Sequence, residues 1–237
     1  MLNCTDRLLS VPTYLNFLIL KIMNALADQI SKFQADFLPN VPAEILATMK
    51  EATQKLADTD ITTRALKTGD QFPEFTLPNE QGRDTAITSL LGQKPFVFTV
   101  YRGGWCPYCN LQLKHYEAHL SQIKDLGAEL LAMTPELPDA SLNTSEINDL
   151  SFTILSDAGN KIAKNMGITF DLAEALRPIY HNFGIDVPAH NGDQSYTLPM
   201  AVTYVVDASG KIVWDFVDSD YTKRAEMSDI LEVLKGL

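Results

Sequence analysis

The spacing of apolar residues predicts two helices near the start of the chain. Between positions 26 and 37 an apolar residue recurs every three or four positions, which places one apolar stripe along a helix. Pro39 ends this helix because proline disrupts a helix interior, and Pro42 suits the first turn of a second helix. We therefore expect residues 1–62 to form a helical extension that serves docking or dimerisation.

Beyond about residue 65, short apolar runs alternate with helical patterns. Three apolar runs predict buried strands, and each is followed by a stretch with the spacing or composition of a helix. The strand segments are 95–101, 128–134 and 152–157, and the helical segments are 110–126, 139–149 and 159–168. Such alternation predicts a mostly parallel sheet with helices on both faces.

The end of the chain has a different pattern. Two apolar runs, 201–207 and 211–217, flank Ala-Ser-Gly and predict an antiparallel hairpin, which a helix over 223–235 follows. The sheet is therefore expected to be mixed, with the hairpin at one edge. Residues 171–198, with scattered proline, glycine and histidine, are expected to be irregular. We assign residues 63–237 to one α/β domain.

Composition narrows the classes of function. The 237 residues are 46% hydrophobic and 21% charged, which is ordinary for a soluble globular protein. The formal net charge of -11 repels phosphate backbones and anionic lipids, so nucleic acid is not an expected partner. Three cysteines do not make a disulfide scaffold, and one close pair indicates a reducing compartment, so we expect a cytoplasmic protein. Cys4 is expected to be incidental.

An apolar run near the N-terminus raises the question of a signal peptide or a membrane span. Residues 8–20 are fewer than the roughly 20 apolar residues that a span needs. Asp6 offsets Arg7, and Lys21 interrupts the apolar stretch, whereas a secretory signal begins with positive charge. We therefore favour a helix packed on the protein or on a partner subunit over a signal peptide. Met23 as the true start is a further alternative.

Two cysteines lie where a predicted strand meets a predicted helix. Cys106 stands at the start of the helix, where unpaired backbone N–H groups carry partial positive charge, so its pKa should fall below the free value of about 8.5. Pro107 fits the first turn, and Cys109 follows about one turn later on nearly the same face. Tyr108, between them, is expected to be exposed. The pair could therefore cycle between dithiol and disulfide.

Two other interpretations of the cysteine pair stay open. Structural zinc needs four ligands, and the nearby candidates His115 and His119 fall on the opposite side of the helix from the cysteines. The two thiols could also be inert core residues, since buried free cysteine is common. Redox chemistry is favoured over both.

The sequence around the pair resembles a known family. "VYRGGWCPYC" is similar to the active-site turn of the thioredoxin superfamily. With "GDQFPEFTLPNEQG", "FTILSDAGNKIAKNMGI" and "TYVVDASGKIVW", it resembles the peroxiredoxins of the alkyl hydroperoxide reductase and thiol-specific antioxidant group, in particular those with a CxxC motif. The resemblance covers about residues 65–235 and implies a thioredoxin-like α/β fold with a central mixed sheet flanked by helices.

This resemblance also implies a chemistry. Cys106 would be the peroxidatic residue, whose thiolate attacks the O–O bond and becomes a sulfenic acid, and Cys109 would resolve it to a disulfide. A thioredoxin-type dithiol protein would restore the pair, and no metal or other cofactor is required. Arg102 could supply positive charge or be a surface residue, and Trp105 would cover the nucleophile. Pro107 would stiffen the loop.

The chain departs from the family pattern at two places. Thr99 and Gly103 stand seven and three residues before Cys106, where typical peroxiredoxins have proline and threonine. Ala201 stands where thioredoxin relatives have a cis-proline. Separately, Glu136 lies near the carboxyl-end edge of the predicted sheet, where ligands bind in such folds, although a solvated surface role is favoured for it.

Three functions are compatible with these features. The resemblance favours a thiol peroxidase that reduces hydrogen peroxide or organic hydroperoxides. The departures favour a protein thiol–disulfide oxidoreductase without peroxidase activity, and the N-terminal helices alone favour a non-enzymatic redox-sensing or interaction module. We expect the peroxidase, without a nucleic-acid partner or a membrane span, and it could form a homodimer through its N-terminal helices.

Overall fold

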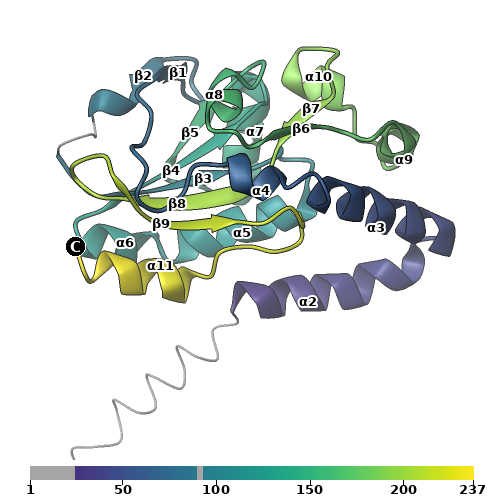
Figure 1. Ribbon diagram of the computed structural model, residues 1–237, viewed down its shortest axis with the longest axis horizontal. Helices are drawn as coiled ribbons and strands as arrows, with labels where there is room; N and C mark the ends of the chain where they lie inside the picture. The colour runs from purple at the N-terminus through teal and green to yellow at the C-terminus, as the bar shows by residue number, and fades with distance from the viewer. Residues whose placement is uncertain (1–24, 90–92) are drawn as a thin grey trace, which may run out of the picture.

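The computed structural model describes residues 25–89 and 93–237, and a five-stranded mixed sheet lies at its centre (Figure 1). The strands are β3 (Phe96–Val100), β4 (Glu129–Thr134), β5 (Thr153–Ser156), β8 (Val202–Val206) and β9 (Ile212–Val217). Their order across the sheet is β5-β4-β3-β8-β9. β4 runs parallel to β3 and β5, whereas β8 runs antiparallel to β3 and β9. The predicted mixed sheet with an antiparallel hairpin at one edge is confirmed.

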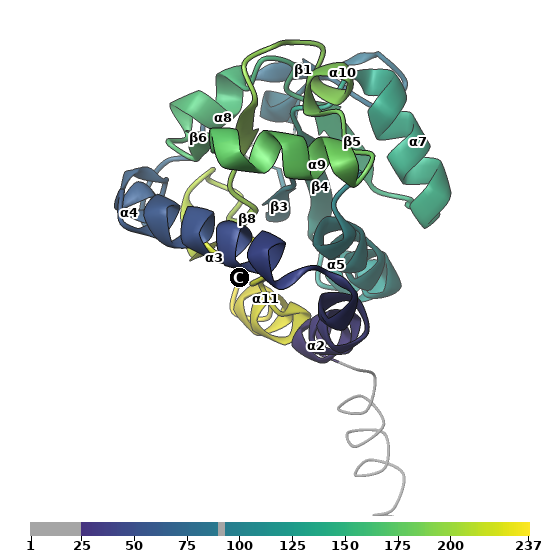
Figure 2. The same cartoon turned by 90° about the vertical axis from the view of Figure 1, so that its right-hand side faces the viewer.

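Both predicted N-terminal helices form, and they pack against the rest of the chain. They are α2 (Leu26–Phe37) and α3 (Ala43–Ala57), with a 3-10 turn, η1 (Leu38–Asn40), between them. α2 contacts α5 (Pro107–Ala118), and α3 contacts η3 (Glu174–Leu176). Figure 2 shows α2 beside α5. The backbone N–H groups of Leu26 and Ala27 donate to the Glu226 carboxylate at 2.9 and 2.7 Å, so a side chain near the C-terminus caps α2.

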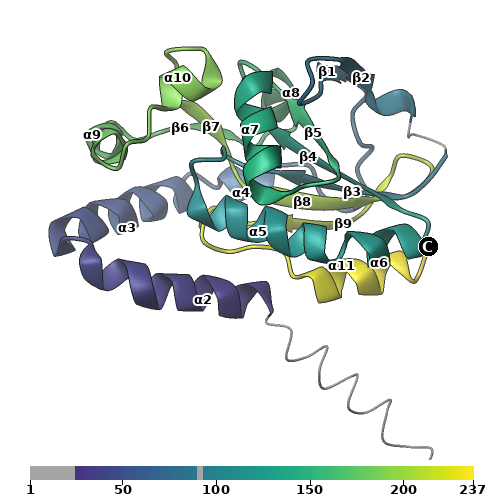
Figure 3. The same ribbon diagram turned by 180° about the vertical axis from the view of Figure 1, so that it is seen from behind.

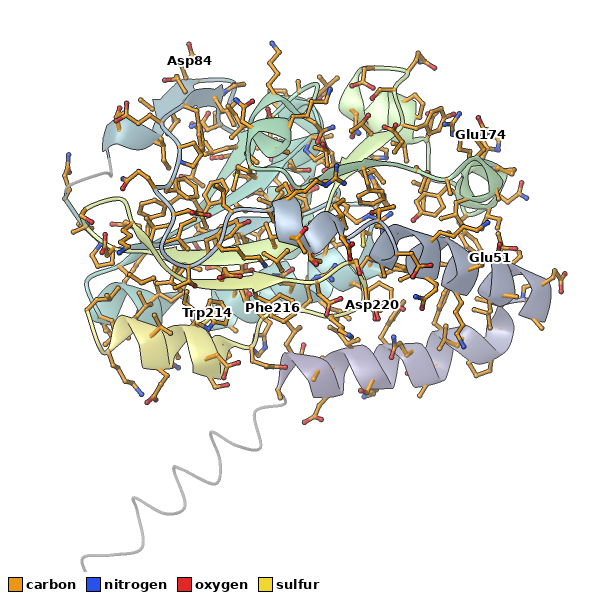
Figure 4. All side chains as sticks on the ribbon, in the orientation of Figure 1. Glu51, Asp84, Glu174, Trp214, Phe216 and Asp220 are labelled. Carbon is orange, nitrogen blue, oxygen red and sulfur yellow. The ribbon has the colours of Figure 1, made fainter. Side chains whose placement is uncertain are left out.

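Alternate strand residues point to opposite faces of the sheet, so each face has its own apolar core. One core joins Val97 of β3 to residues such as Leu113 and Ile230, from helices that lie together on one side of the sheet in Figure 3. These helices are α5, α6 (Leu120–Asp125) and α11 (Met227–Leu234). Trp214 and Phe216 extend from β9 to the same side (Figure 4). Leu26 and Ile30 of α2 belong to this core too.

The second core lies on the opposite face of the sheet. Phe96 and Phe98 of β3 pack there against Phe72, with ring centroids 5.3 and 4.9 Å apart, and Met166 joins the same cluster. Nearby elements are α4 (Ile61–Arg64), β1 (Thr76–Pro78), β2 (Asp84–Ala86), η2 (Ile87–Ser89) and α8 (Lys161–Asn165). α7 (Pro138–Asn148) packs beside β5.

The segment expected to be irregular contains regular structure, so that prediction is wrong. Within 171–198 lie η3, α9 (Arg177–Asn182) and α10 (Val187–Asn191). The segment is bracketed by β6 (Thr169–Asp171) and β7 (Thr197–Pro199), which pair antiparallel in a small second sheet. It buries Leu172, Tyr180 and Leu198 in a third apolar cluster. Residues 171–198 therefore form an ordered part of the fold.

Two predictions about the first residues lie outside what the structure describes. They concern Cys4 and the apolar run at 8–20 with its alternatives. Within residues 25–89 and 93–237, no helix is long and apolar enough to cross a membrane. The predicted division between residues 62 and 63 falls within α4 and stays a prediction.

Candidate active site

The two cysteines lie at the junction of β3 and α5, as the sequence predicted. Cys106 is the N-cap residue of α5, and Pro107 is its first residue. The Cys106 N–H donates to the carbonyl of Gly103 at 3.1 Å, which keeps the connecting loop tight. Gly103 has φ +151, where a Cβ would overlap Trp105, and a Cβ on Gly104 would overlap a side chain of α7. The loop therefore requires both glycines.

A buried carboxylate holds this loop from the side of β4. Glu136 is completely buried, and its Oε2 accepts a hydrogen bond from the Gly104 N–H at 2.9 Å. Its Oε1 lies 2.9 Å from Nδ1 of His190, and this hydrogen bond raises the pKa of His190. The solvated role favoured for Glu136 is therefore wrong, because the side chain turns inward to the loop amide and α10 covers it.

The two thiols are buried next to each other. Cys106 is 2% exposed, Cys109 is fully buried, and a hydrogen bond joins their side chains. Arg224 donates from Nη2 to the Cys109 Sγ at 3.4 Å, and the backbone N–H of Arg102 bonds the same sulfur. Burial opposes ionisation of Cys109, but the hydrogen bond from Cys106 and the charge of Arg224 lower its pKa to about 5.

The predicted fall in the pKa of Cys106 is wrong. Its hydrogen bond to Cys109, together with burial, raises the pKa of the Cys106 thiol instead. The side chain of Cys106 makes no hydrogen bond to the backbone N–H groups at the start of α5, which were expected to stabilise its thiolate. The two thiols titrate as a coupled pair, and the contact with Arg224 favours the negative charge on Cys109.

Arg102 lies beside the thiols and is buried, which excludes the surface role considered for it. It is 2% exposed, and its guanidinium carbon lies 5.3, 5.7 and 4.9 Å from the ring centroids of Trp105, Tyr180 and Tyr221. Its Nη2 donates to the hydroxyl of Tyr180 at 2.5 Å. The charge of Arg102 favours the thiolate form of both cysteines, so it supplies positive charge to the site.

Several residues of the site were not identified from the sequence. Arg224, Tyr180 and Tyr221 reach the loop from positions far along the chain, and no local motif marks them. Tyr108 was expected to be exposed, but it is 5% exposed because α2 covers it. Its ring meets Phe33 edge-on, with centroids 5.3 Å apart.

A cavity of about 950 Å³ opens over Cys106. Trp105, Cys106 and Pro107 line it, whereas Cys109 does not. The other walls come from α2, η1, α3, residues 183–185 and the loop 218–223 that follows β9, on which Figure 4 labels Asp220. Of the two sulfurs, Cys106 is therefore the one that a substrate in the cavity meets.

Thr99 and Ala201 stand at two positions where the chain departs from the family pattern, and the structure places both at strands of the central sheet. Thr99 lies inside β3, where its hydroxyl donates to the carbonyl of Val202 at 3.2 Å, away from the cavity lining. Ala201 precedes β8, and no peptide bond among the described residues is cis. In the same residues, no group of three or more His, Cys, Asp and Glu side chains could hold a metal ion.

Comparison with known proteins decides the family. The AhpC/TSA family matches residues 68–215, which is more than half of the chain. The chain belongs to the AhpC/TSA family. The chloroplastic peroxiredoxin Q of Triticum aestivum is 25% identical over 196 residues, which are 83% of this chain and 79% of that protein. The solved structure of peroxidoxin BcpB from Mycobacterium tuberculosis has a TM-score of 0.57 and 19% identity, covering 73% of this chain and 98% of that one.

Peroxiredoxin Bcp of Escherichia coli (strain K12) is also similar, with 28% identity over 103 residues, which are 44% of this chain and 65% of that protein. The predicted family and fold are therefore confirmed: the chain is a peroxiredoxin of the thioredoxin superfamily, with a mixed sheet flanked by helices. It is thus an oxidoreductase of the thiol peroxidase class, which implies a hydroperoxide substrate and a thioredoxin-type reductant. α2, α3 and Arg224 lie outside the matched residues 68–215.

Proposed function

We propose that this AhpC/TSA protein reduces hydroperoxides through a Cys106–Cys109 dithiol, which a thioredoxin-type protein restores. The observation that carries the proposal is the order of the two sulfurs. Cys106 lines the cavity, and Cys109 lies behind it, hydrogen-bonded to it and next to Arg224. One sulfur can therefore meet the substrate while the other holds the charge and stands ready to form the disulfide.

The first step moves a proton and breaks the O–O bond. Cys106 passes its proton to the Cys109 thiolate, and the resulting Cys106 thiolate attacks the hydroxyl oxygen of the hydroperoxide. An S–O bond forms, the O–O bond breaks, and the alkoxide or hydroxide leaves. Cys109 returns the proton to this leaving oxygen, so the products are an alcohol or water and a Cys106 sulfenic acid. Arg102 stabilises the negative charge that moves along these atoms.

The second step forms the disulfide. The Cys109 thiolate, held ionised by Arg224, attacks the sulfur of the Cys106 sulfenic acid. The S–S bond forms, the S–O bond breaks, and the leaving hydroxide takes a proton from the buffer to become water. A dithiol protein then reduces the disulfide by thiol exchange, which returns both cysteines to the reduced state and oxidises the partner.

Single-turnover kinetics test this route. Reduced protein is mixed with hydrogen peroxide in a stopped-flow instrument, and the loss of free thiol is followed. We expect fast oxidation that Cys106→Ser abolishes, and a sulfenic acid that a dimedone-type reagent traps in Cys109→Ser. Oxidation of the wild type no faster than that of a free thiol of similar pKa would contradict the proposal.

A second function is supported by the loop before Cys106. Gly103 has no hydroxyl to orient a peroxide, and the loop resembles the dithiol turn of thioredoxin relatives. A protein thiol–disulfide oxidoreductase would fit these features. Reduction of insulin disulfides in the presence of dithiothreitol, together with no acceleration by hydroperoxide, would favour it over the peroxidase.

We also propose a cytoplasmic location and a homodimer that uses the N-terminal helices. The close dithiol in a chain with few cysteines supports the first, and the position of α2 and α3 outside the residues that the family matches supports the second. Light scattering over a dilution series would give the mass of the assembly, and a monomer at every concentration would contradict the dimer. The acidic charge of -11 supports the absence of a nucleic-acid partner.

A further inference from the structure

The cavity over Cys106 is much larger than hydrogen peroxide requires. A single water occupies about 30 Å³ in the liquid, and hydrogen peroxide adds only one oxygen to it, whereas the cavity holds about 950 Å³. Pockets of about 300–1,000 Å³ are typical of sites that enclose most of a drug-sized organic ligand. The size of the cavity therefore points to a substrate with a bulky group attached to its peroxide.

α2, η1 and α3 line the cavity with apolar side chains, beside the polar Gln34, Lys50 and Gln54. α2, η1 and α3 contribute Phe33, Phe37, Leu38, Leu46 and Met49, and the opposite side contributes Phe183 and Ile185. Leu38 is 36% and Phe183 is 41% exposed, so large apolar side chains stand open to water in the lining of the cavity that Cys106 shares. A ligand that covered them would remove apolar surface from water, which is the main favourable term in binding such a group.

The apolar wall is fixed to the domain. Phe33 meets Tyr108 edge-on at 5.3 Å, one residue before Cys109, and Phe37 meets Phe183 at 6.3 Å. The start of α2 is held by the two hydrogen bonds to Glu226. A wall that is already in place binds an apolar group without first being ordered, and this raises affinity. All of it except Phe183 and Ile185 lies outside the residues that the AhpC/TSA family matches.

The polar end of the cavity can orient a peroxide. Arg102 lines the cavity and is 2% exposed. It has no ion-pair partner among the described residues. Its Nη2 bonds Tyr180, whereas its Nε is buried without a hydrogen-bond partner in the same part of the chain. Peroxide oxygens accept hydrogen bonds, so the guanidinium of Arg102 favours an orientation in which the peroxide group of the substrate lies at Cys106. The apolar group of the substrate then lies against the N-terminal helices.

We propose that α2, η1 and α3 are a specificity element that selects hydroperoxides carried on a bulky apolar group, with that group held between the N-terminal helices and Phe183 and the peroxide at Cys106. This rests on the peroxidase function proposed above and adds which substrates the site prefers. The helices outside the family match thereby determine substrate choice, while the loop around Cys106 performs the chemistry.

The test compares two substrates in the full chain. Second-order rate constants for oxidation of the reduced protein are measured with cumene hydroperoxide and with hydrogen peroxide, and their ratio is taken. We expect the ratio to exceed one in the wild type and to fall roughly 10-fold in the double variant Leu46→Gln/Phe183→Gln, since one lost apolar group in a pocket changes discrimination by about that factor. Ile147→Gln is the matched control, because Ile147 is 65% exposed on α7 and does not line the cavity.

A binding measurement separates failure of this inference from failure of the peroxidase function. The product alcohol, 2-phenyl-2-propanol, is titrated calorimetrically into Cys106→Ser protein with and without the Leu46→Gln/Phe183→Gln changes. Binding that weakens roughly 10-fold in the combined variant supports the specificity element even if turnover is absent. The inference is overturned if Leu46→Gln/Phe183→Gln changes neither the ratio of the two rate constants nor the binding of 2-phenyl-2-propanol. It is also overturned if these changes slow only the reduction of the disulfide by a dithiol protein, because the cavity would then bind the reductant.

Discussion

Arg224 favours the thiolate form of Cys109, and removing its charge should have a measurable consequence. Its Nη2 lies 3.4 Å from the Cys109 Sγ, and it is 7% exposed. Its Nη1 is held by the carbonyls of Tyr221 and Lys223, so the guanidinium cannot easily follow the sulfur elsewhere. Arg224→Gln keeps a hydrogen-bonding side chain but removes the positive charge from the thiolate.

The size of the effect follows from this contact. A hydrogen bond to a charged group contributes about 1.5–3 kcal/mol, and 1.36 kcal/mol corresponds to one pKa unit, so the variant should raise the pKa of Cys109 by about 1 to 2. From a value of about 5, the pKa moves to about 6 to 7. At about pH 6 the singly ionised fraction of the pair then falls from roughly nine-tenths to roughly half or less.

Thiolate ultraviolet absorbance, followed through a pH titration of the reduced protein, measures this change. Arg224→Lys keeps a charge but loses the planar donor and should lie between the wild type and Arg224→Gln. Arg83→Gln, an exposed arginine on the turn between β1 and β2, is the control and should titrate like the wild type. A titration midpoint that Arg224→Gln leaves in place would show that this guanidinium does not hold the charge, and the proposed second step would lose its basis.

Two further predictions concern the loop and its carboxylate. Gly104→Ala should lower the free energy of unfolding, measured with urea, by about 1–3 kcal/mol, because its Cβ would overlap the Thr144 hydroxyl, and adding Thr144→Ala should recover part of the loss. The pKa of His190 is raised above 6.5 by Glu136, so the stability this contact adds is fully present below about pH 6.5 and is lost as pH rises through the folded-state pKa. The Tm difference between wild type and His190→Gln should therefore be larger at about pH 6 than at about pH 9, and equal differences would contradict the assignment.

The elements that the sequence predicted well are those with a local pattern. All five residues of β3 are buried, and the run of aromatic and β-branched residues that forms it is recognisable without any knowledge of its neighbours. The N-terminal helices were predicted from apolar spacing, and Pro39 and Pro42 marked the break between them, where η1 now lies. In each case the information that defines the element lies within a few residues of it.

The parts that the sequence missed depend on distant contacts. β6 and β7 have three residues each, and Thr169 pairs with Pro199, so neither strand has a pattern of its own long enough to recognise. The burial of Glu136 depends on α10, and that of Tyr108 depends on α2. Side chains whose environment comes from another part of the chain look like surface residues in a one-dimensional pattern.

For the active site too, the sequence predicted what depends on local pattern and missed what depends on distant residues. The motif around Cys106 and Cys109 is local, and it predicted that the two thiols are neighbours at the start of a helix, as the structure has them. The location of the charge within the pair could not be predicted, because Arg224 stands 115 residues from Cys109 in the sequence. The sequence pattern pointed to the helix start and to Arg102 as sources of positive charge, and neither distinguishes Cys109 from Cys106 in the way that Arg224 does.

The spacing of the cysteines and the position of the N-terminal helices are related. Cys106 and Cys109 already share a hydrogen bond within the first turn of α5, so a disulfide can close there without unwinding the helix. Tyr108 lies between them and packs on Phe33, so a helix start that stays folded also keeps α2 in contact with the site. From the short spacing we therefore expect the apolar wall to stay beside the two sulfurs when the disulfide forms.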